Sequence, residues 1–173
     1  MSRKGTIGPS IPQWTNAPAI LYHGTCKTSA QDITANGVRL LRGSCYLDFG
    51  PGFYTTENYD QAAAFSRLHH HKQAAVVKIE VDREKLADLS FLAFGNATAS
   101  FWNLICHHRL AKGQDHRRAK APHMYDVVVG PVASSWNYDP RKRAIIDGYD
   151  QISFHTEKAM GMLSGCSKSL LPV

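Results

Sequence analysis

No apolar stretch of this sequence comes near the roughly 20 residues that a helix needs to cross a bilayer. The N-terminal residues Met1 to Gly5 include two basic side chains, but no apolar segment follows them, so we expect no secretory signal. We therefore expect no membrane partner and a cytoplasmic location. Hydrophobic residues still make up 43% of the chain, which is enough for a globular domain with a continuous core.

Cysteine is scarce, with four residues in 173, and no two of them form a Cys-x-x-Cys pair. Their separations match no zinc pattern, so we expect free thiols in a reducing compartment. Three consecutive histidines, His69, His70 and His71, stand out as possible ligands. Adjacent residues at the end of a helix point in different directions, so three contiguous histidines rarely bind one ion. We expect no metal site.

Acidic residues are fewer than basic ones, 14 against 20, which leaves a formal net charge of +6 and a pI near 9.2. The positive charges gather between Arg109 and Lys120 and again in the run Arg141 to Arg143. A basic balance favours anionic partners such as phosphate groups or nucleic acid. Charge runs are more often solvated surface than binding sites, so a dedicated nucleic-acid interface is the weaker interpretation.

Internal repeats and low-complexity tracts are absent, and the length fits one domain. Residues 1–18 contain Pro, Gly and Ser without periodicity, so we predict a flexible N-terminal arm. We place the folded domain at residues 19–165 and a C-terminal tail at residues 166–173.

Hydrophobic periodicity predicts strands and helices that do not alternate regularly. The predicted strands are residues 19–23, 74–81, 125–129 and 151–154. The predicted helices are residues 29–36, a segment from Thr55 or Thr56 to about His69, residues 98–111, and a last helix capped by Thr156. The basic stretches 113–123 and 134–148 are expected to be irregular loops. This pattern favours a mixed α+β domain over a doubly wound parallel sheet.

Three short motifs carry the chemical information, and their order matters more than any one of them. They are Tyr22-His23-Gly24-Thr25, the Gly-rich run from Asp48 to Thr56, and the run from Asp150 to Thr156. A strand ending in His-Gly, a Gly-flanked Tyr and a polar residue heading a late strand resemble the ADP-ribosyltransferase superfamily. The similarity is closest to a bacterial branch known mostly as a domain of unknown function. It implies two small, packed, antiparallel-rich sheets with flanking helices and a central NAD cleft.

The resemblance implies that NAD is bound as a substrate and that its nicotinamide–ribose bond is cleaved through an oxocarbenium-like transition state. His23 would hydrogen-bond the adenine-side ribose, and the Gly24 backbone would meet the nicotinamide carboxamide. A glycine suits that place because a ligand can approach its backbone closely. Thr25 belongs to the same motif and is included among the NAD-binding residues.

The resemblance also places two aromatic side chains against the nicotinamide ring. Tyr54 follows the Gly-Pro-Gly-Phe turn and would stack on nicotinamide, and Phe65, eleven residues later, would offer a second π-face. Arg42 is a candidate contact for the pyrophosphate. Asp48 precedes the turn and is expected to cap it through its own backbone and not to touch substrate.

Gln151 is the main departure from the superfamily pattern. Many transferases of this kind have Glu at the head of the late strand, where a carboxylate grips the ribose 2′-hydroxyl and supports the cationic transition state. Gln can hydrogen-bond that hydroxyl but supplies no negative charge and takes no proton. The bacterial branch often has Gln in this context. Gln151 is therefore grouped with His23 and Tyr54 as the catalytic set.

The leading hypothesis is an NAD-dependent mono-ADP-ribosyltransferase, a glycosyltransferase that acts as a toxin or as an effector delivered into a target cell. The acceptor stays open, with protein side chains and nucleic acid as macromolecular candidates. One alternative is an NAD glycohydrolase that uses the same cleft with water as the acceptor. A second alternative is a non-catalytic module that binds a nucleotide or nucleic acid.

Overall fold

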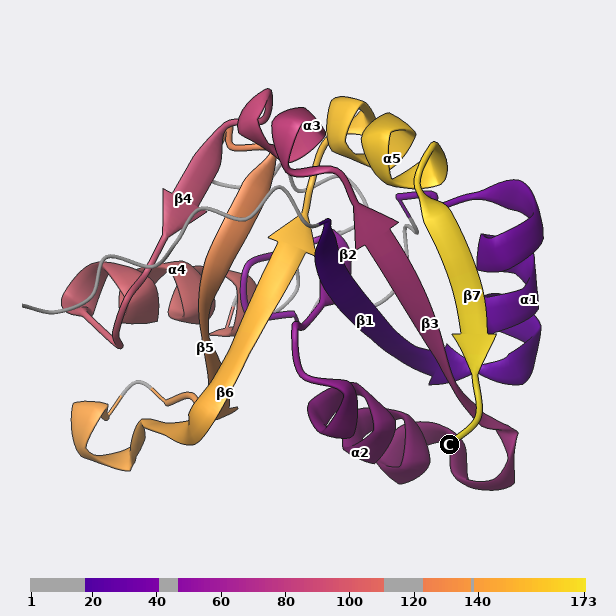
Figure 1. Cartoon of the computed structure of the whole chain (residues 1–173). Helices are drawn as coiled ribbons and strands as arrows, with labels where there is room; N and C mark the ends of the chain where they lie inside the picture. Colours follow the sequence, from indigo (N-terminus) through magenta and orange to yellow (C-terminus); the bar gives the residue numbers. More distant parts are fainter. Residues whose placement is uncertain (1–17, 41–46, 111–122, 138) are drawn as a thin grey trace, which may run out of the picture.

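The computed structural model describes residues 18–40, 47–110, 123–137 and 139–173, and these residues form two β-sheets with five α-helices around them (Figure 1). The expected α+β class is confirmed. Apart from Pro18, the predicted N-terminal arm lies outside the described residues. The same holds for most of the loop predicted at residues 113–123.

Sheet A contains three antiparallel strands in the order β1 (Ala19–Cys26), β3 (Ala74–Val81) and β7 (Ser167–Leu171). The bounds of β3 are those predicted from its β-branched residues. Strand β1 continues past the predicted end at His23 because all eight of its residues pair with β3. The predicted C-terminal tail is corrected: residues 167–171 pair with the other edge of β3, so the domain includes them.

Sheet B contains four strands in the order β2 (Phe53–Thr55), β6 (Ala144–Phe154), β5 (Val127–Ser135) and β4 (Phe91–Ala93). The β4–β5 pair is parallel and the other pairs are antiparallel. The expectation of an irregular loop at residues 134–148 is wrong, because β5 and β6 extend into it and pair with each other. Strand β5 also runs through Pro131, next to which the register shifts, and such an irregularity accommodates a residue without an N–H.

The helices are α1 (Lys27–Asn36), α2 (Tyr59–His70), α3 (Arg83–Ala87), α4 (Ala99–Leu110) and α5 (Glu157–Ser164). Short 3-10 turns lie at residues 71–73 and 140–142. The predictions of α4, and of α5 with Thr156 as its cap, are confirmed. The predicted start of α2 at Thr55 or Thr56 is wrong, because Thr56 pairs with β1 and Asn58 caps the helix instead.

Two groups of buried apolar residues hold sheet A in place. One group lies between the two sheets and beneath α1 and α5, and it includes Leu21, Val77 and Phe154. The other packs α2 against the opposite face of sheet A through Ala62, Ala63 and Val76. Sheet A is therefore covered on both faces, and along β3 the residues alternate between the two groups, with Val77 in one and Val76 in the other.

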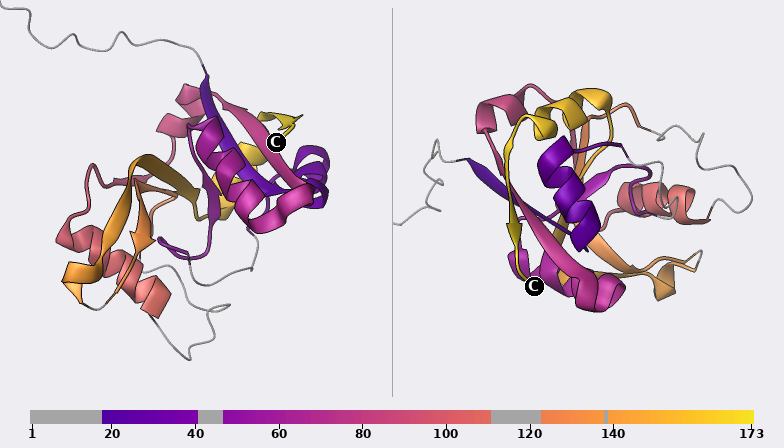
Figure 2. Two further views of the ribbon diagram at one scale, coloured as in Figure 1. Left: turned by 90° about the horizontal axis from the view of Figure 1, so that it is seen from below. Right: turned by 90° about the vertical axis from the view of Figure 1, so that its right-hand side faces the viewer.

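A third buried group joins α4 to the face of sheet B that points away from sheet A. It includes Phe49, Phe101, Ile105 and Val128. Figure 2 shows α4 beside sheet B, on the side away from α1. Because Phe49 belongs to this group, the Gly-rich turn that carries it is anchored between α4 and sheet B.

One buried hydroxyl links α2 to sheet A. The Ser66 side chain is fully buried; its Oγ donates to the Thr25 carbonyl at 2.7 Å and accepts from the Ala75 amide at 2.9 Å. The hydroxyl thus satisfies one backbone group at the end of β1 and another at the start of β3.

Replacing Ser66 with Ala is expected to lower the free energy of unfolding by about 1–3 kcal/mol, because two buried backbone groups lose their partner. Urea unfolding followed by circular dichroism measures the change. The matched control is Ser134→Ala at an exposed position, for which a change within about 0.5 kcal/mol is expected. Equal midpoints for the two variants would show that the Ser66 hydroxyl contributes nothing to the fold.

Candidate functional site

Strands β1 and β2 of the two sheets meet at one point. The Tyr22 amide donates to the Thr56 carbonyl at 2.8 Å, and the Thr56 amide donates to the Tyr22 carbonyl at 3.0 Å. Antiparallel pairs alternate, so the backbone groups of Gly24 point to the same side as those of Tyr22. Within the described residues no backbone group pairs with Gly24 on that side. The Gly24 N–H and C=O are therefore available at the edge where the sheets separate.

Helix α2 makes glycine necessary at this edge. A Cβ on Gly24 would lie 2.2 Å from the Ala62 carbonyl oxygen, far inside van der Waals contact. The backbone of α2 thus forms one wall beside the free groups of Gly24. This explains the His-Gly sequence by packing, independently of any ligand.

His23 lies between the sheets beside Tyr54. Its Nδ1 is 2.7 Å from the Tyr54 carbonyl oxygen, and its ring stacks on Phe53 with centroids 4.3 Å apart. Burial lowers the pKa of His23 below its usual range, so the ring is neutral at pH 7. Since a carbonyl only accepts, Nδ1 carries the proton and Nε2 keeps a lone pair.

Tyr54 is held by the Gly-rich turn before it. Its hydroxyl donates to the Gly50 carbonyl at 2.8 Å and accepts from the Phe49 amide at 2.9 Å. Gly50 has a φ of +88°, a conformation that glycine adopts without strain. Burial raises the pKa of Tyr54, so the phenol stays neutral. The hydroxyl is used within the protein, and the ring packs against the buried group between α4 and sheet B.

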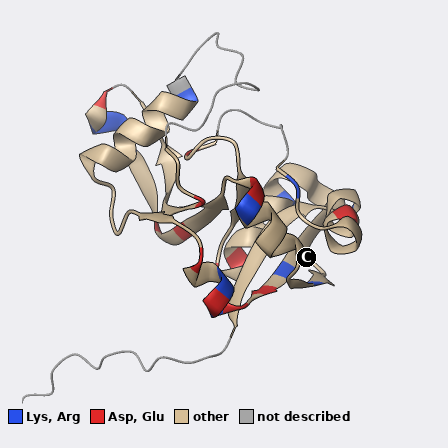
Figure 3. Cartoon of the chain, turned by 90° about the horizontal axis from the view of Figure 1, so that it is seen from above, with Lys and Arg blue, Asp and Glu red and all other residues tan. Residues whose placement is uncertain are grey.

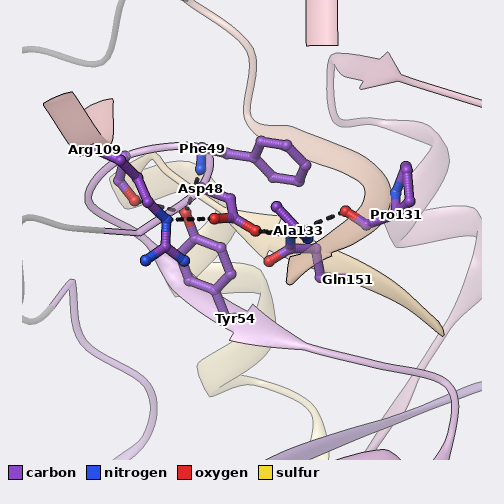
Figure 4. A network of polar contacts seen from close by, with 8 residues as sticks. Asp48, Phe49, Tyr54, Arg109, Pro131, Ala133 and Gln151 are labelled. Atoms are coloured by element: carbon purple, nitrogen blue, oxygen red, sulfur yellow. Dashed lines mark hydrogen bonds and ion pairs between the residues drawn. The ribbon is translucent and has the colours of Figure 1, made fainter. Parts of the chain in front are cut away.

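Gln151 and Asp48 are joined in the buried network of Figure 4. Gln151 Nε2 donates to Asp48 Oδ2 at 2.6 Å and to the Pro131 carbonyl at 3.1 Å. Asp48 Oδ1 pairs with Arg109 Nε at 2.5 Å, and its Oδ2 accepts from the Ala133 amide at 3.3 Å. Asp48 is only 2% exposed. The expectation that Asp48 only caps its own turn is therefore corrected: its carboxylate joins α4, β5 and β6.

The Gln151 amide oxygen remains available. Both N–H groups of the side chain are used, whereas Oε1 accepts no hydrogen bond from any residue that the structure describes. A glutamine amide presents its oxygen when its nitrogen is held by two acceptors. The residue therefore offers a hydrogen-bond acceptor, as a ribose hydroxyl would require.

The other residues predicted for the site lie apart from this set. Phe65 is 52% exposed on α2 and packs on His69, with centroids 4.4 Å apart, whereas Tyr54 makes a ring contact with His155, with centroids 6.2 Å apart. Thr25 is buried, and its carbonyl accepts from Ser66. Arg42 lies outside the described residues. The predicted catalytic residues divide between the two faces of sheet B. The Tyr54 ring and Gln151 lie on the face that carries Ser153 and points toward α4. The His23 ring stacks on Phe53 on the opposite face and reaches Tyr54 only at its backbone carbonyl.

A cavity of about 480 Å³ lies on the other face of β6. Its lining includes Thr56, Gln61, Asp150 and Ile152. Side chains alternate along a strand, so Asp150 and Ile152 face this cavity while Gln151 faces Asp48. Gln61 closes one side, because its Nε2 donates to the Asp150 carbonyl at 3.0 Å. The cavity and the Gln151 network are therefore separated by the strand itself.

Two of the three basic residues in the run 141–143 are held by local partners. Arg141 pairs with Asp139 at 3.0 Å, and Arg143 Nε donates to the Asn137 carbonyl at 2.7 Å. In Figure 3, acidic residues lie close to basic ones over much of the described ribbon. These contacts do not favour a continuous anionic-ligand surface at residues 141–143.

Two further classes of feature can be assessed for the described residues. No group of three His, Cys, Asp or Glu side chains in that part of the chain is arranged to hold a metal ion. No helix there is long and apolar enough to span a membrane.

Sequence reasoning missed His155 and the role of Arg109. Gln151, Ser153 and His155 share one face of β6 by the two-residue period of a strand, so that period is a signal for His155. Arg109 belongs to a basic run, and nothing local in the sequence indicates its pairing with Asp48, 61 residues away.

His155 ties the end of β6 to the Gly-rich turn. Its Nδ1 is 2.8 Å from the Pro51 carbonyl oxygen, and its Nε2 is 2.8 Å from Ser153 Oγ. Burial lowers the pKa of His155 to about 4. The neutral ring therefore donates from Nδ1 to Pro51 and accepts the Ser153 hydroxyl proton at Nε2. Ser153 is fully buried, so this pair holds structure and does not face a substrate.

Stability is expected to fall as the pH drops from about 6.5 to about 4, because in that window the unfolded chain binds a proton at residue 155 that the folded chain excludes. The full loss corresponds to about 3 kcal/mol. Urea unfolding at several pH values measures it. His155→Gln should flatten the dependence, whereas His69→Gln at an exposed position should leave it unchanged. An identical slope in wild type and His155→Gln would refute the assignment.

Comparison with known proteins places the chain in a family. A family model described as "Protein of unknown function (DUF3990)" matches residues 19–148, from β1 into the start of β6. The matched region contains His23, Asp48 and Tyr54 and ends before Gln151. A search of curated proteins finds no match. Because the family model covers well over half of the sequence, the chain belongs to the DUF3990 family.

Proposed function

We propose that the protein is an NAD-dependent mono-ADP-ribosyltransferase. It cleaves the nicotinamide–ribose bond of NAD and transfers ADP-ribose to an acceptor. The observation that carries the proposal is the convergence of three strands from both sheets: His23 of β1 contacts Tyr54 of β2, and β2 pairs with β6, which bears Gln151.

The free edge of Gly24 supports a carboxamide contact. A carboxamide has one acceptor and one donor group, and the Gly24 N–H and C=O offer the complementary pair from one residue. Helix α2 stands against that edge at Ala62, and His23 holds β2 beside it. A planar amide placed there would add to the edge of β1 as a strand does.

Cleavage of the nicotinamide–ribose bond depends more on hydrogen bonds that hold the ribose than on a strong general base. In the reaction, the bond between the anomeric carbon and the nicotinamide nitrogen breaks, and its electron pair passes to the nicotinamide ring. The lone pair of the acceptor forms the new bond, and the acceptor proton passes to solvent. Gln151 Oε1 would accept a hydrogen bond from a ribose hydroxyl and hold the sugar during the oxocarbenium-like step. The neutral His23 has a second acceptor in Nε2 for another hydroxyl.

The nature of the acceptor separates transfer from hydrolysis. With water as the acceptor the same arrangement would make the protein an NAD glycohydrolase. With no reaction it would be a nucleotide-binding module. Release of nicotinamide, measured alone and with cell lysate, distinguishes the three.

NAD is expected to stabilise the folded protein. A ligand that binds only the native state adds RT ln(1 + [L]/Kd), which is about 2.7 kcal/mol at a hundredfold excess over Kd. Thermal unfolding with millimolar NAD, nicotinamide or ADP-ribose measures the effect. If all three leave the melting temperature unchanged, the protein has no NAD site.

Purified protein is expected to release nicotinamide from NAD, and Gln151→Ala is expected to lower the turnover by about tenfold to a hundredfold, the effect of losing one well-placed hydrogen bond in the transition state. Gln73→Ala, at an exposed position, is the matched control and should retain full turnover. Turnover of Gln151→Ala equal to that of the control would exclude Gln151 from the catalytic set.

A further inference from the structure

We propose that Asp48 is a positioning residue for this site, which orients the Gln151 amide and supplies the negative charge that a glutamine lacks. The inference rests on the proposed function and extends it to a residue outside the His, Tyr and Gln set. It is carried by the buried contacts around the Asp48 carboxylate in Figure 4.

The orientation of Gln151 follows from its partners. Asp48 Oδ2 and the Pro131 carbonyl are both acceptors, so the nitrogen of the amide must face them and the oxygen must face away. A flipped amide would place Oε1 against two acceptors in a buried environment. The shorter contact, 2.6 Å, is to the carboxylate, so Asp48 is the stronger of the two constraints.

The charge of Asp48 is maintained by its other contacts. A buried carboxylate stays ionised only when it is paired and hydrogen-bonded, and Arg109 and the Ala133 amide provide both. Arg109 itself lies over the Trp136 ring, with Cζ 5.1 Å from the centroid. The guanidinium and the indole therefore hold the carboxylate in one position.

The two oxygens of Asp48 have different tasks. Oδ1 pairs with Arg109 and Oδ2 contacts Gln151, so the carboxylate stands between the positive guanidinium and the amide (Figure 4). A charge-assisted hydrogen bond to the amide nitrogen polarises the amide and increases the negative charge on Oε1. In the proposed reaction, this added negative charge on Oε1 would stabilise the positive charge that develops on the ribose.

The same turn links Asp48 to Tyr54. Phe49 follows Asp48 directly, and its amide donates to the Tyr54 hydroxyl. The position of the carboxylate and that of the Tyr54 ring are therefore set by neighbouring residues of one turn. In a surface ion pair, Asp48 would need only Arg109 as a partner. Here the turn that carries Asp48 also positions Tyr54.

Asp48→Asn is expected to lower kcat for nicotinamide release by about tenfold to a hundredfold and to change KM by less than about threefold. An Asn side chain has one oxygen, which the charged Arg109 attracts, so its NH₂ group faces Gln151. The Gln151 amide then turns its oxygen toward residue 48 and presents a donor at the site.

The decisive comparison is between Gln151→Glu and the double variant Asp48→Asn/Gln151→Glu. Gln151→Glu alone places two carboxylates in contact and is expected to be poorly active. In the double variant the amide introduced at position 48 donates to the carboxylate introduced at position 151, and the negative charge moves nearer to the ribose. The kcat of the double variant is expected to exceed that of Gln151→Glu by at least about tenfold. If Asp48 had only a structural role, the double variant would have a lower kcat than Gln151→Glu, because the losses caused by the two substitutions would add. This comparison still tests the role of Asp48 if the single variant Asp48→Asn does not fold.

Asp126→Asn is the matched control. Asp126 is also a buried aspartate, but its carboxylate accepts hydrogen bonds from Ser90 and Thr156 and lies outside the Gln151 network. The control should lower the melting temperature and leave kcat per folded molecule unchanged.

The outcomes separate the two proposals. If wild-type protein releases no nicotinamide from NAD, with or without lysate, the proposed function fails and this inference fails with it. If wild type is active and Asp48→Asn retains its kcat, or the double variant is no better than Gln151→Glu, only the role of Asp48 is overturned.

Discussion

A single buried carboxylate, that of Asp48, joins segments that are far apart in the sequence: the Gly-rich turn, α4 through Arg109, β5 through Ala133, and β6 through Gln151. Burying such a charge is costly unless every oxygen is paired, and here both oxygens have partners. The turn is thereby fixed against sheet B, and with it the Tyr54 hydroxyl that bonds to two residues of the turn. The geometry of the candidate site depends on this one charge being satisfied.

The separation of the two sheets is the second constraint. Within the described ranges of the chain they share one bridge, between Tyr22 and Thr56, and then diverge, with the His23 ring inserted between β1 and β2. A continuous sheet would have used the edge of β1 at Gly24 for pairing. The divergence leaves the N–H and C=O of Gly24 without a partner among the described residues. Helix α2 lies so close to Gly24 that little space remains beside these groups. The result is an edge that offers one donor and one acceptor beside the backbone of α2.

Membership of the DUF3990 family defines what the chain is related to, and the proposed reaction is an interpretation of the site. Packing within the protein also accounts for each motif residue separately. Gly24 is required by α2, Tyr54 by the turn, and Gln151 by Asp48. The site is thus built into the fold, and loss of any one contact would disturb the others through the shared turn.

Local patterns in the sequence are sufficient to predict the α+β class, the bounds of β3, and the helices α4 and α5, because periodicity and capping depend on residues close together in the chain. The order of short motifs also indicates His23, Tyr54 and Gln151. Three other features appear only in the folded chain: β7 completes sheet A, Phe65 faces outward, and Asp48 holds Gln151 across 103 residues. Such contacts depend on which strands and helices pack together, and that choice is made by burial over the whole domain, which no short stretch of sequence records.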